Sequence, residues 1–320
     1  MRILSGIQPS GIPHLGNYFG YIQPNVSLQK TADVTLMIAD LHALTTVQDP
    51  KAMRENGAQV ALDLLACGFD AEKGTLFFQS HVAEHAELMW ILATVSPMGL
   101  LERAVSFKEK VEKGITPSVG LFAYPVLQTA DILLYNADTV PVGKDQKQHL
   151  EIARDITIKF NNAYGETFVL PEAMIREDSA VVPGTDGQKM SKSYGNTIPL
   201  FGTEKTIQKA IMGIVTDSKG VEEPKDPDTC TVYQIHKLFL SKDEAETLAE
   251  KYRAGGLGYG DAKKLLFSAY MDTFGTMRKK REELEKKPDL VREIIESGAR
   301  KAKNVAQATM ERVRKAVGLR

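Results

Sequence analysis

The sequence predicts an α/β protein that begins with a parallel β-sheet and ends in a purely helical region. Three short apolar runs, at residues 3–7, 34–39 and 75–79, are each followed by helix-compatible sequence at the spacing of a crossover connection. Beyond Asn196 such runs stop and long helical patterns follow. With 320 residues, 43% of them hydrophobic and 25% charged, the chain is long enough for two domains.

The first strand opens into a glycine-rich turn that contains Gly11, His14, Gly16 and Asn17 and leads into a helix over residues 18–30. Such a turn suits a phosphate, because the N–H groups of the helix N-terminus point at it. The two glycines have P-loop spacing, but the Lys-Ser/Thr pair that a P-loop requires is absent, and no G-x-G-x-x-G follows a strand. Neither familiar nucleotide motif therefore fits.

The middle of the chain adds further elements of the same kind. A helix over residues 50–67 separates the second and third strands, with Pro50 near its start and Gly68 closing it. Residues 139–142 are expected as another strand, and residues 145–160 as the helix after it. The expected core residues between the third and fourth strands are Met89, Trp90 and Met98.

A helix over residues 125–135 carries Asp131 among apolar neighbours. Burying this carboxylate is costly unless donors meet it, and an exposed position on the outer face of the helix is the open alternative. His42 and His149 are likewise compatible with ordinary core or surface positions, and no His/Cys/Glu spacing indicates zinc.

Residues 170–188 lose periodicity and lead, as a loop, into a lysine- and serine-rich stretch at residues 187–196. Lys189 and Lys192 lie three residues apart and suit a polyphosphate, because each ammonium group can meet a different phosphate. Serine N–H and O–H groups would supply further donors. A solvated turn has the same composition and is the alternative.

The last part of the chain is expected to be all-α, with helices over residues 204–212, 242–253, 261–285 and 289–317. The apolar face of the last helix is marked by Val291, Ile294, Ile295, Ala302, Val305 and Val313. Residues 275–320 hold 14 Lys/Arg against 7 Asp/Glu, in a chain whose net charge is −1. Either a nucleic-acid-facing surface or a solvated helical face explains this asymmetry.

Cys67 and Cys230 are too few and too far apart for a disulfide framework or a metal site, and free thiols fit a reducing cytoplasm. The chain opens on a strand-like segment without the basic and apolar regions of a signal peptide. No uncharged run reaches membrane-spanning length. We expect a cytoplasmic protein without a membrane partner.

Two motifs, His14-Leu-Gly-Asn17 after the first strand and Lys189-Met-Ser-Lys-Ser193 after the sheet, resemble the signature regions of class I aminoacyl-tRNA synthetases. Together with residues 5–11, 129–135 and 142–149, they resemble the tryptophanyl-tRNA synthetases from end to end. The resemblance implies a Rossmann-like catalytic domain (1–188), a KMSKS loop (189–193) and a helical, tRNA anticodon-binding domain (194–320). It also implies a homodimer that uses ATP, Mg²⁺, L-tryptophan and tRNA(Trp).

In that family the tryptophan carboxylate attacks the α-phosphate of ATP, pyrophosphate leaves, and a tRNA ribose hydroxyl then takes the acyl group from the adenylate. No enzyme nucleophile is needed, so the protein supplies positioning and charge stabilisation. The catalytic residues that the resemblance implies are Gln8, Lys110, Lys189, Ser191 and Lys192, with a solvated helix charge as the alternative for Lys110. The lysine loop would hold the departing pyrophosphate together with Mg²⁺.

The resemblance also implies two binding sets. The ATP set is Gln8, Pro9, Ser10, His14, Gly16, Asn17, Gly143, Lys144, Asp145, Val182, Lys189, Met190, Ser191, Lys192 and Ser193. The tryptophan set is Leu4, Gly6, His42, Tyr124, Gln128, Asp131, Val140, Val142 and Gln146. Asp131 would accept the indole N–H, because an ionised carboxylate only accepts and indole only donates.

This chain departs from the commoner bacterial pattern. Leu4 and Gln128 stand where a phenylalanine and a methionine are usual, residues 13–15 replace a Thr-Ile pair, and the loop at 176–188 differs. Some members with this loop carry four cysteines as an iron–sulfur ligand set. Here the four positions hold Cys230, Tyr252, Tyr259 and Ala262, so no cluster is expected.

Two rival functions stay open at this point. A tyrosyl-tRNA synthetase shares the fold and both signatures, but it would hold a phenol with a Tyr/Asp pair, so a tyrosine beside Asp131 would favour it. A non-catalytic paralogue that binds tRNA or a nucleotide is the other.

Overall fold

The computed structural model describes residues 1–104, 118–137, 139–142, 147–175 and 181–319. Its centre is a five-stranded, fully parallel sheet in the order β3-β2-β1-β4-β5. The strands are β1 (Arg2–Ile7), β2 (Asp33–Ile38), β3 (Thr75–Phe78), β4 (Thr139–Val142) and β5 (Glu172–Ile175). The four strands expected from the sequence are confirmed.

The fifth strand differs from the expectation, which has residues 170–188 as a loop. β5 is four residues long and pairs with β4 alone, with Ala173 opposite Val140. Its sequence, Glu-Ala-Met-Ile, holds one β-branched residue and no aromatic residue, and the strand forms because β4 offers unpaired backbone groups along its free side.

The strand order reverses between β1 and β4, since the chain runs outward from β1 through β2 to β3 and then crosses back to β4. Ligands of open parallel sheets bind outside the carboxyl ends of the strands at such a switch point. The turn that begins at Gln8, directly after β1, lies at this place. The topology therefore singles out the glycine-rich turn independently of its composition.

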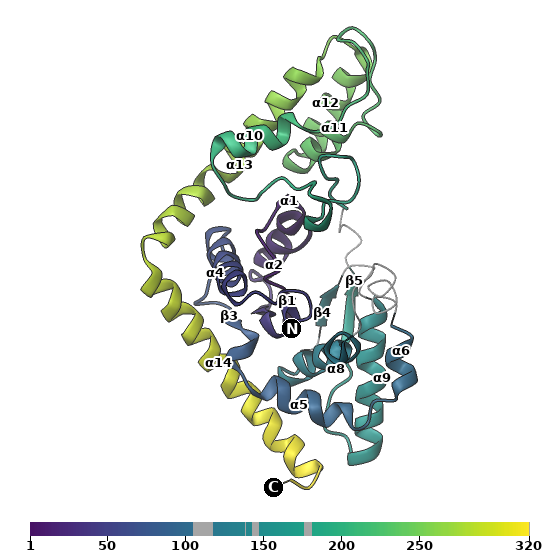
Figure 1. Ribbon diagram of the computed structural model, residues 1–320, viewed down its shortest axis with the longest axis vertical. Helices are drawn as coiled ribbons and strands as arrows, with labels where there is room; N and C mark the ends of the chain where they lie inside the picture. The colour runs from purple at the N-terminus through teal and green to yellow at the C-terminus, as the bar shows by residue number, and fades with distance from the viewer. Residues whose placement is uncertain (105–117, 138, 143–146, 176–180, 320) are drawn as a thin grey trace.

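Successive strand residues fill two cores, one on each face of the sheet, because side chains alternate along a strand. Ile3 and Leu76 join the core beneath α4 (Pro50–Ala66), while the next residues, Leu4 and Phe77, join the core on the opposite face. That second core is covered by α5 (Glu84–Ala93), α8 (Val119–Leu134) and α9 (Lys147–Tyr164) (Figure 1).

The expected helices of the first part are present with shifted ends. The helix after the first turn consists of α1 (Leu15–Asn17), η1 (Tyr18–Ile22) and α2 (Gln23–Leu28), and the shorter elements are α3 (Asp40–Ala43), η2 (Gln79–His81) and α6 (Met98–Glu102). α8 begins six residues before the expected start and contains Pro125. Ser118 caps it by accepting from Leu121 N at 3.1 Å. Burial of Leu121 and Val126 outweighs the one hydrogen bond that Pro125 cannot donate.

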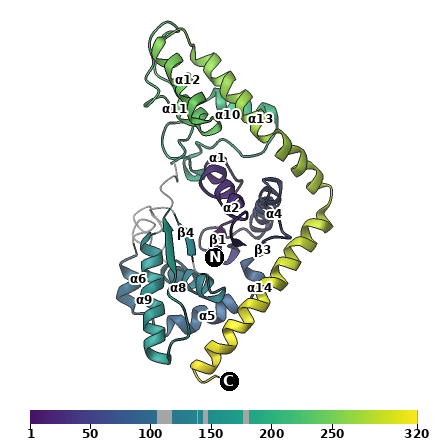
Figure 2. The same cartoon turned by 180° about the vertical axis from the view of Figure 1, so that it is seen from behind.

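The described residues after Ile175 contain no strand, which confirms the helical second part. Its elements are η4 (Lys192–Tyr194), α10 (Glu204–Met212), α11 (Thr231–His236), η5 (Lys237–Phe239), α12 (Lys242–Ala254), α13 (Tyr259–Glu285) and α14 (Pro288–Ala316). Figures 1 and 2 show α10 to α12 gathered at one end, with α13 and α14 running along the edge of the molecule. None of the helices described is both long and apolar enough to cross a membrane.

α14 returns to the sheet and packs directly on β3. A Cβ atom at Gly298 would lie 2.0 Å from the carbonyl oxygen of Leu76, so only glycine allows this approach. Ala302 and Val313 lie in the same core as α5 and α8. Val305 is 43% exposed, so its expected place on the buried face is wrong, because the face runs through Ala302, Ala306 and Met310 at helical spacing.

Two of the three expected core residues before α8 are also corrected. Trp90 is 71% exposed and Met98 is 64% exposed, whereas Met89 packs partly buried against the core. α5 is apolar on most of its circumference, but only the face with Leu88 and Leu92 meets the sheet. Periodicity cannot assign a face in so uniformly apolar a helix.

Candidate active site

The turn after β1 is shaped by a histidine that folds back over a glycine. The backbone N–H of His14 donates to Asn17 Oδ1 at 3.1 Å, which begins α1. A Cβ atom at Gly16 would lie 3.0 Å from Nδ1 and Cε1 of the His14 ring, so Gly16 leaves the space that this ring occupies. His14 is buried, and its Nδ1 has no hydrogen-bond partner among the residues described.

The second motif lies directly against this turn, although it is remote in sequence. Leu15 N donates to Ile198 O at 3.0 Å, and Leu200 N donates to Pro13 O at 2.9 Å. The Lys192 ammonium reaches the same turn and donates to Gly11 O at 2.8 Å. The two signature regions thus form one continuous surface at the switch point of the sheet.

Asn196 holds the lysine loop in shape, and sequence reasoning gave it no role. Its buried side chain accepts from Ser191 N at 2.8 Å and donates to Asp186 Oδ1 at 2.7 Å and to Lys189 O at 3.2 Å. An asparagine directly after a glycine in a loop was the available signal. Lys189 itself is exposed, and Met190 N donates to Val182 O at 2.9 Å.

The loop's cation is strongly perturbed by its surroundings. Burial lowers the pKa of Lys192 to about 8, partly opposed by the charge of Asp63. Burial, and then the charge of Lys192, lower the pKa of His14 to about 4, so His14 is neutral at pH 7. A half-buried ammonium beside a neutral imidazole is suited to an anion.

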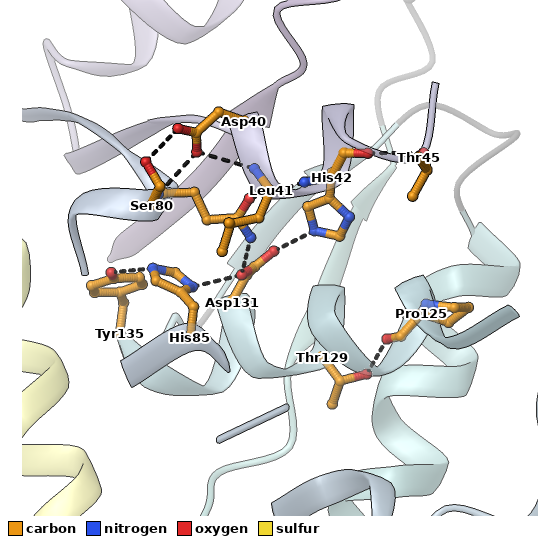
Figure 3. A network of polar contacts seen from close by, with 11 residues as sticks. Asp40, Leu41, His42, Thr45, Ser80, His85, Pro125, Thr129, Asp131 and Tyr135 are labelled. Atoms are coloured by element: carbon orange, nitrogen blue, oxygen red, sulfur yellow. Dashed lines mark hydrogen bonds and ion pairs between the residues drawn. The ribbon is translucent and has the colours of Figure 1, made fainter. Parts of the chain in front are cut away.

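Asp131 is buried rather than exposed, which settles the alternative left open by the sequence. It is 2% exposed and lies in a network of polar side chains from α3, η2, α5 and α8 (Figure 3). Its Oδ2 lies 2.7 Å from His42 Nε2, and its Oδ1 lies 2.6 Å from His85 Nδ1 and accepts from Gln79 Nε2 at 2.7 Å. Burial would raise the pKa of Asp131, but His42 and then His85 outweigh it and bring the pKa down to about 2.

Gln79 and His85 are functional candidates that sequence reasoning missed. Gln79 directly follows β3, at the carboxyl end of the sheet, and this position was the signal that could have found it. Nothing local marks His85, which reaches Asp131 only through the packing of α5 on α8. Among the described residues no tyrosine is hydrogen-bonded to Asp131, and the Tyr135 hydroxyl lies 2.7 Å from His85 Nε2.

Three members of the tryptophan set share one face of α8. Tyr124, Gln128 and Asp131 are spaced four and three residues apart, which places them one above the other on a helix. The Tyr124 hydroxyl lies 2.6 Å from His149 Nε2. Of the other members, Leu4 and Gly6 lie on β1 and Val140 on β4, and Leu4 and Val140 are buried.

Several expected site residues lie outside the described residues, namely Lys110, Gly143, Lys144, Asp145, Gln146 and the side chain of Val142. In the turn, Pro9 is buried and Ser10 N donates to Gln8 O at 2.9 Å. Ser193 is exposed at the start of η4.

The four positions that the resemblance compares with an iron–sulfur ligand set hold Cys230, Tyr252, Tyr259 and Ala262. Tyr252 and Ala262 are fully buried, and the Tyr259 hydroxyl donates to Asp217 Oδ1 at 2.7 Å. Across the parts of the chain that the structure describes, no three His, Cys, Asp or Glu side chains are grouped so that they could hold a metal ion.

The family described as "tRNA synthetases class I (W and Y)" matches residues 1–275. The chain is 54% identical to the tryptophan–tRNA ligase of Rhodopirellula baltica over 320 residues, covering 100% of both chains. It is 51% identical to that of Fusobacterium nucleatum over 319 residues, covering 99% of this chain and 98% of the relative.

The tryptophanyl-tRNA synthetase of Campylobacter jejuni, solved in complex with ADP and tryptophan, superposes with a TM-score of 0.93 at 49% identity, covering 99% of this chain and 100% of that one. These alignments span the sheet, both loops and the helical region. They include the two signature regions that the structure brings together. The chain belongs to the class I aminoacyl-tRNA synthetases of the tryptophan and tyrosine family.

Proposed function

We propose that this protein is a tryptophan–tRNA ligase. It activates L-tryptophan with ATP, which gives tryptophanyl-adenylate and pyrophosphate, and then transfers the tryptophanyl group to tRNA(Trp). The observation that carries the choice of amino acid is the buried, ionised Asp131, whose donors in the described chain are His42, His85 and Gln79 rather than a tyrosine.

The nucleotide occupies the surface formed by the first turn and the lysine loop. Lys189, Ser191 and Lys192 hold the pyrophosphate as it leaves, and Gln8 and the turn after it contact the rest of ATP. Their support is the bond from Lys192 to Gly11 and the unpartnered Nδ1 of His14. Mg²⁺ enters with ATP on its phosphates, since the lysine loop offers cations rather than the oxygen ligands that Mg²⁺ requires.

The remaining expected contacts complete this picture. Gly143, Lys144 and Asp145, which follow β4 in the sequence, would contact the ribose, and Gln146 would contact the amino acid. Val182 offers its backbone to adenine, and Lys110 adds a further cation near the phosphates.

Tryptophan places its indole N–H on Asp131, between β1, β4 and the face of α8 that carries Tyr124 and Gln128. Phenylalanine lacks this donor and would leave a buried carboxylate short of a partner, which costs on the order of 1–3 kcal/mol or more. Catalysis itself follows from positioning: the carboxylate of tryptophan is held in line with the α-phosphate, and cationic donors stabilise the developing charge.

The helical region at residues 194–320 binds tRNA, with the basic residues 275–320 as its electrostatic part, and tRNA affinity therefore falls as salt concentration rises. We also propose a homodimer, supported by the large exposed apolar side chains of Trp90 on α5 and Met98 on α6. A cytoplasmic location suits a tRNA substrate and two free cysteines.

The decisive experiment is amino-acid-dependent exchange of pyrophosphate into ATP, with each of the twenty amino acids in turn. Exchange that depends on tryptophan supports the proposal. Exchange with tyrosine instead would identify a tyrosyl enzyme, and exchange with no amino acid would favour a non-catalytic paralogue.

A further inference from the structure

The two oxygens of Asp131 have unequal surroundings. Oδ1 meets two side chains, Gln79 and His85, at 2.7 and 2.6 Å, whereas Oδ2 meets only His42, at 2.7 Å. A carboxylate offers about four acceptor positions, two on each oxygen. Within the described chain, Oδ1 is therefore filled, and Oδ2 keeps room for one more donor.

The donors on Oδ1 are themselves fixed. Gln79 is completely buried, and its Oε1 accepts from the backbone N–H of His42 at 3.4 Å, so its amide group points its N–H at Asp131. Ser80 donates from N and Oγ to Asp40, which ties η2 to α3 beside this bond (Figure 3). Rotation of the Asp131 carboxylate would break both the Gln79 and the His85 contacts at once.

The partners of its two ring nitrogens determine which tautomer His85 adopts. Nε2 lies 2.7 Å from the Tyr135 hydroxyl, and His85 is completely buried. Burial, and then the charges of Asp131 and Glu84, raise the pKa of Tyr135 far above its usual range, so the hydroxyl keeps its hydrogen. The contact with Asp131 places the hydrogen: an ionised carboxylate only accepts, so His85 Nδ1, 2.6 Å from Oδ1, carries it. In this neutral tautomer Nε2 has a free lone pair, and the Tyr135 hydroxyl donates to it.

We propose that His85, held in its Nδ1–H tautomer by Tyr135, is a positioning residue for amino-acid selection. With Gln79 it fixes the Asp131 carboxylate so that only Oδ2 can accept the ring N–H of tryptophan. The idea rests on the proposed function, because the indole contact of Asp131 belongs to it. Its physical basis is that a carboxylate with one filled oxygen offers a single acceptor in a fixed position, so a ring donor is accepted only where the indole N–H lies, whereas a rotating carboxylate could meet donors in other positions.

The tautomer can be read directly by NMR on full-length protein labelled with ¹⁵N-histidine. The chain has six histidines, and the His85 signals are those lost in His85→Asn. We expect a protonated Nδ1 and an unprotonated Nε2 at pH 7, the less common tautomer in water. A protonated Nε2 at His85 would overturn the proposal.

The KM values for tryptophan and for ATP distinguish a positioning role of the His85–Tyr135 pair from a general loss of structure. Tyr135→Phe should raise KM for tryptophan about tenfold in pyrophosphate exchange, with KM for ATP unchanged, because one hydrogen bond that orders a charged group is lost. The matched control is Tyr233→Phe, since Tyr233 is equally buried and donates to Ala245 O at 2.9 Å far from the site. Equal tryptophan KM values in the two variants would contradict the role.

If the role of His85 is to donate a hydrogen bond to Asp131, another side chain with an N–H at position 85 should preserve tryptophan activation. His85→Asn keeps an N–H near the position of Nδ1 and should retain activity within roughly tenfold, whereas His85→Leu should lose about 100-fold in kcat/KM for tryptophan. Equal losses of kcat/KM in His85→Asn and His85→Leu would argue against the proposal. If His85→Leu does not fold, the tryptophan KM of Tyr135→Phe tests the proposal instead. If the parent protein shows no tryptophan-dependent exchange, the proposed function fails; an active parent with the other tautomer refutes this inference alone.

Discussion

The ammonium group of Lys192 donates to the carbonyl oxygen of Gly11 at 2.8 Å, across a sequence separation of 181 residues. This bond joins the loop after the sheet to the turn after the first strand. Burial at this place lowers the pKa of Lys192 to about 8. A cation that is partly desolvated in the free protein gains more than a solvated one when a phosphate replaces the carbonyl.

Lys192→Met should lower kcat for tryptophan activation about 100-fold, with a small change in KM for ATP, because the cation meets charge that develops as pyrophosphate leaves. Lys205→Met is the control, since Lys205 is exposed on α10. Both constants come from pyrophosphate exchange at varied ATP. A raised KM with unchanged kcat would mean that Lys192 binds ATP equally before and during the reaction.

The same lysine gives a pH dependence with a defined sign. Its pKa of about 8 means that half of the ammonium form of the free protein is already lost at about pH 8. The kcat/KM for ATP should therefore be level up to about one pH unit below this value and fall as pH rises through it. Lys192→Arg keeps its charge throughout this range and should not show the decline, even if its activity is lower. A parallel decline in both proteins would assign the titration to another group.

Arg281 and Asp63 form a buried ion pair between α13 and α4, with Nε and Oδ1 2.6 Å apart. Arg281→Met should destabilise the protein by about 3 kcal/mol at pH 7.5, because it leaves a buried carboxylate without its partner. Burial already raises the pKa of Asp63 to about 6, so the loss should shrink at pH 5, where the carboxyl group is protonated.

Urea denaturation at the two pH values measures this effect. The double variant Asp63→Leu/Arg281→Met should recover most of the stability at pH 7.5, because no buried unpaired charge then remains: Glu285, the other carboxylate that Arg281 contacts, is 43% exposed. Additive losses in the double variant would show that the two residues do not depend on each other.

Asn196→Ala should lower kcat for activation roughly tenfold while leaving the fold intact. The side chain makes three hydrogen bonds, to Ser191 N, Asp186 Oδ1 and Lys189 O, and these define the loop that carries both lysines. Asn162→Ala, on the exposed side of α9, is the control for the substitution itself. Unchanged kcat in Asn196→Ala would show that the loop takes its active shape without this residue.

Trp90→Glu should convert a dimer into monomers if the exposed face of α5 and α6 is the subunit interface. Sedimentation velocity at micromolar concentration measures the change. Val215→Glu in the helical part is the matched control, since Val215 is 61% exposed. A parent protein that sediments as a monomer would end the dimer proposal.

The secondary structure was predictable because its causes are local. Apolar runs of strand length, a proline at a helix start and a glycine after a helix end gave four strands and the main helices with small boundary shifts. β5 was missed because Glu-Ala-Met-Ile has little strand preference of its own, so this strand depends on its pairing with β4. Trp90 was wrongly predicted to be buried, because tertiary packing decides which face of an apolar helix meets the core.

In the candidate site, too, the groups with local sequence signals were predictable and those brought in by tertiary packing were not. The hydrogen-bond donors of the first turn and the cations of the lysine loop could be predicted as phosphate-binding groups from residue types at fixed spacing. The family resemblance predicted Asp131 as the partner of the indole N–H. Gln79 and His85 lie 52 and 46 residues from Asp131, and no local pattern links them to it.

The sequence by itself determined the elements, their order and the chemical groups available, because periodicity and turn chemistry act over a few residues. Only the tertiary structure decided which polar groups are desolvated and which of them gain hydrogen-bond partners. Asp131 was equally compatible with an exposed helix face and a buried pocket until α3, η2 and α5 were packed around it. The reason is physical: the cost of desolvating a charge and the donors that offset it both come from distant segments, so they exist only in the folded chain.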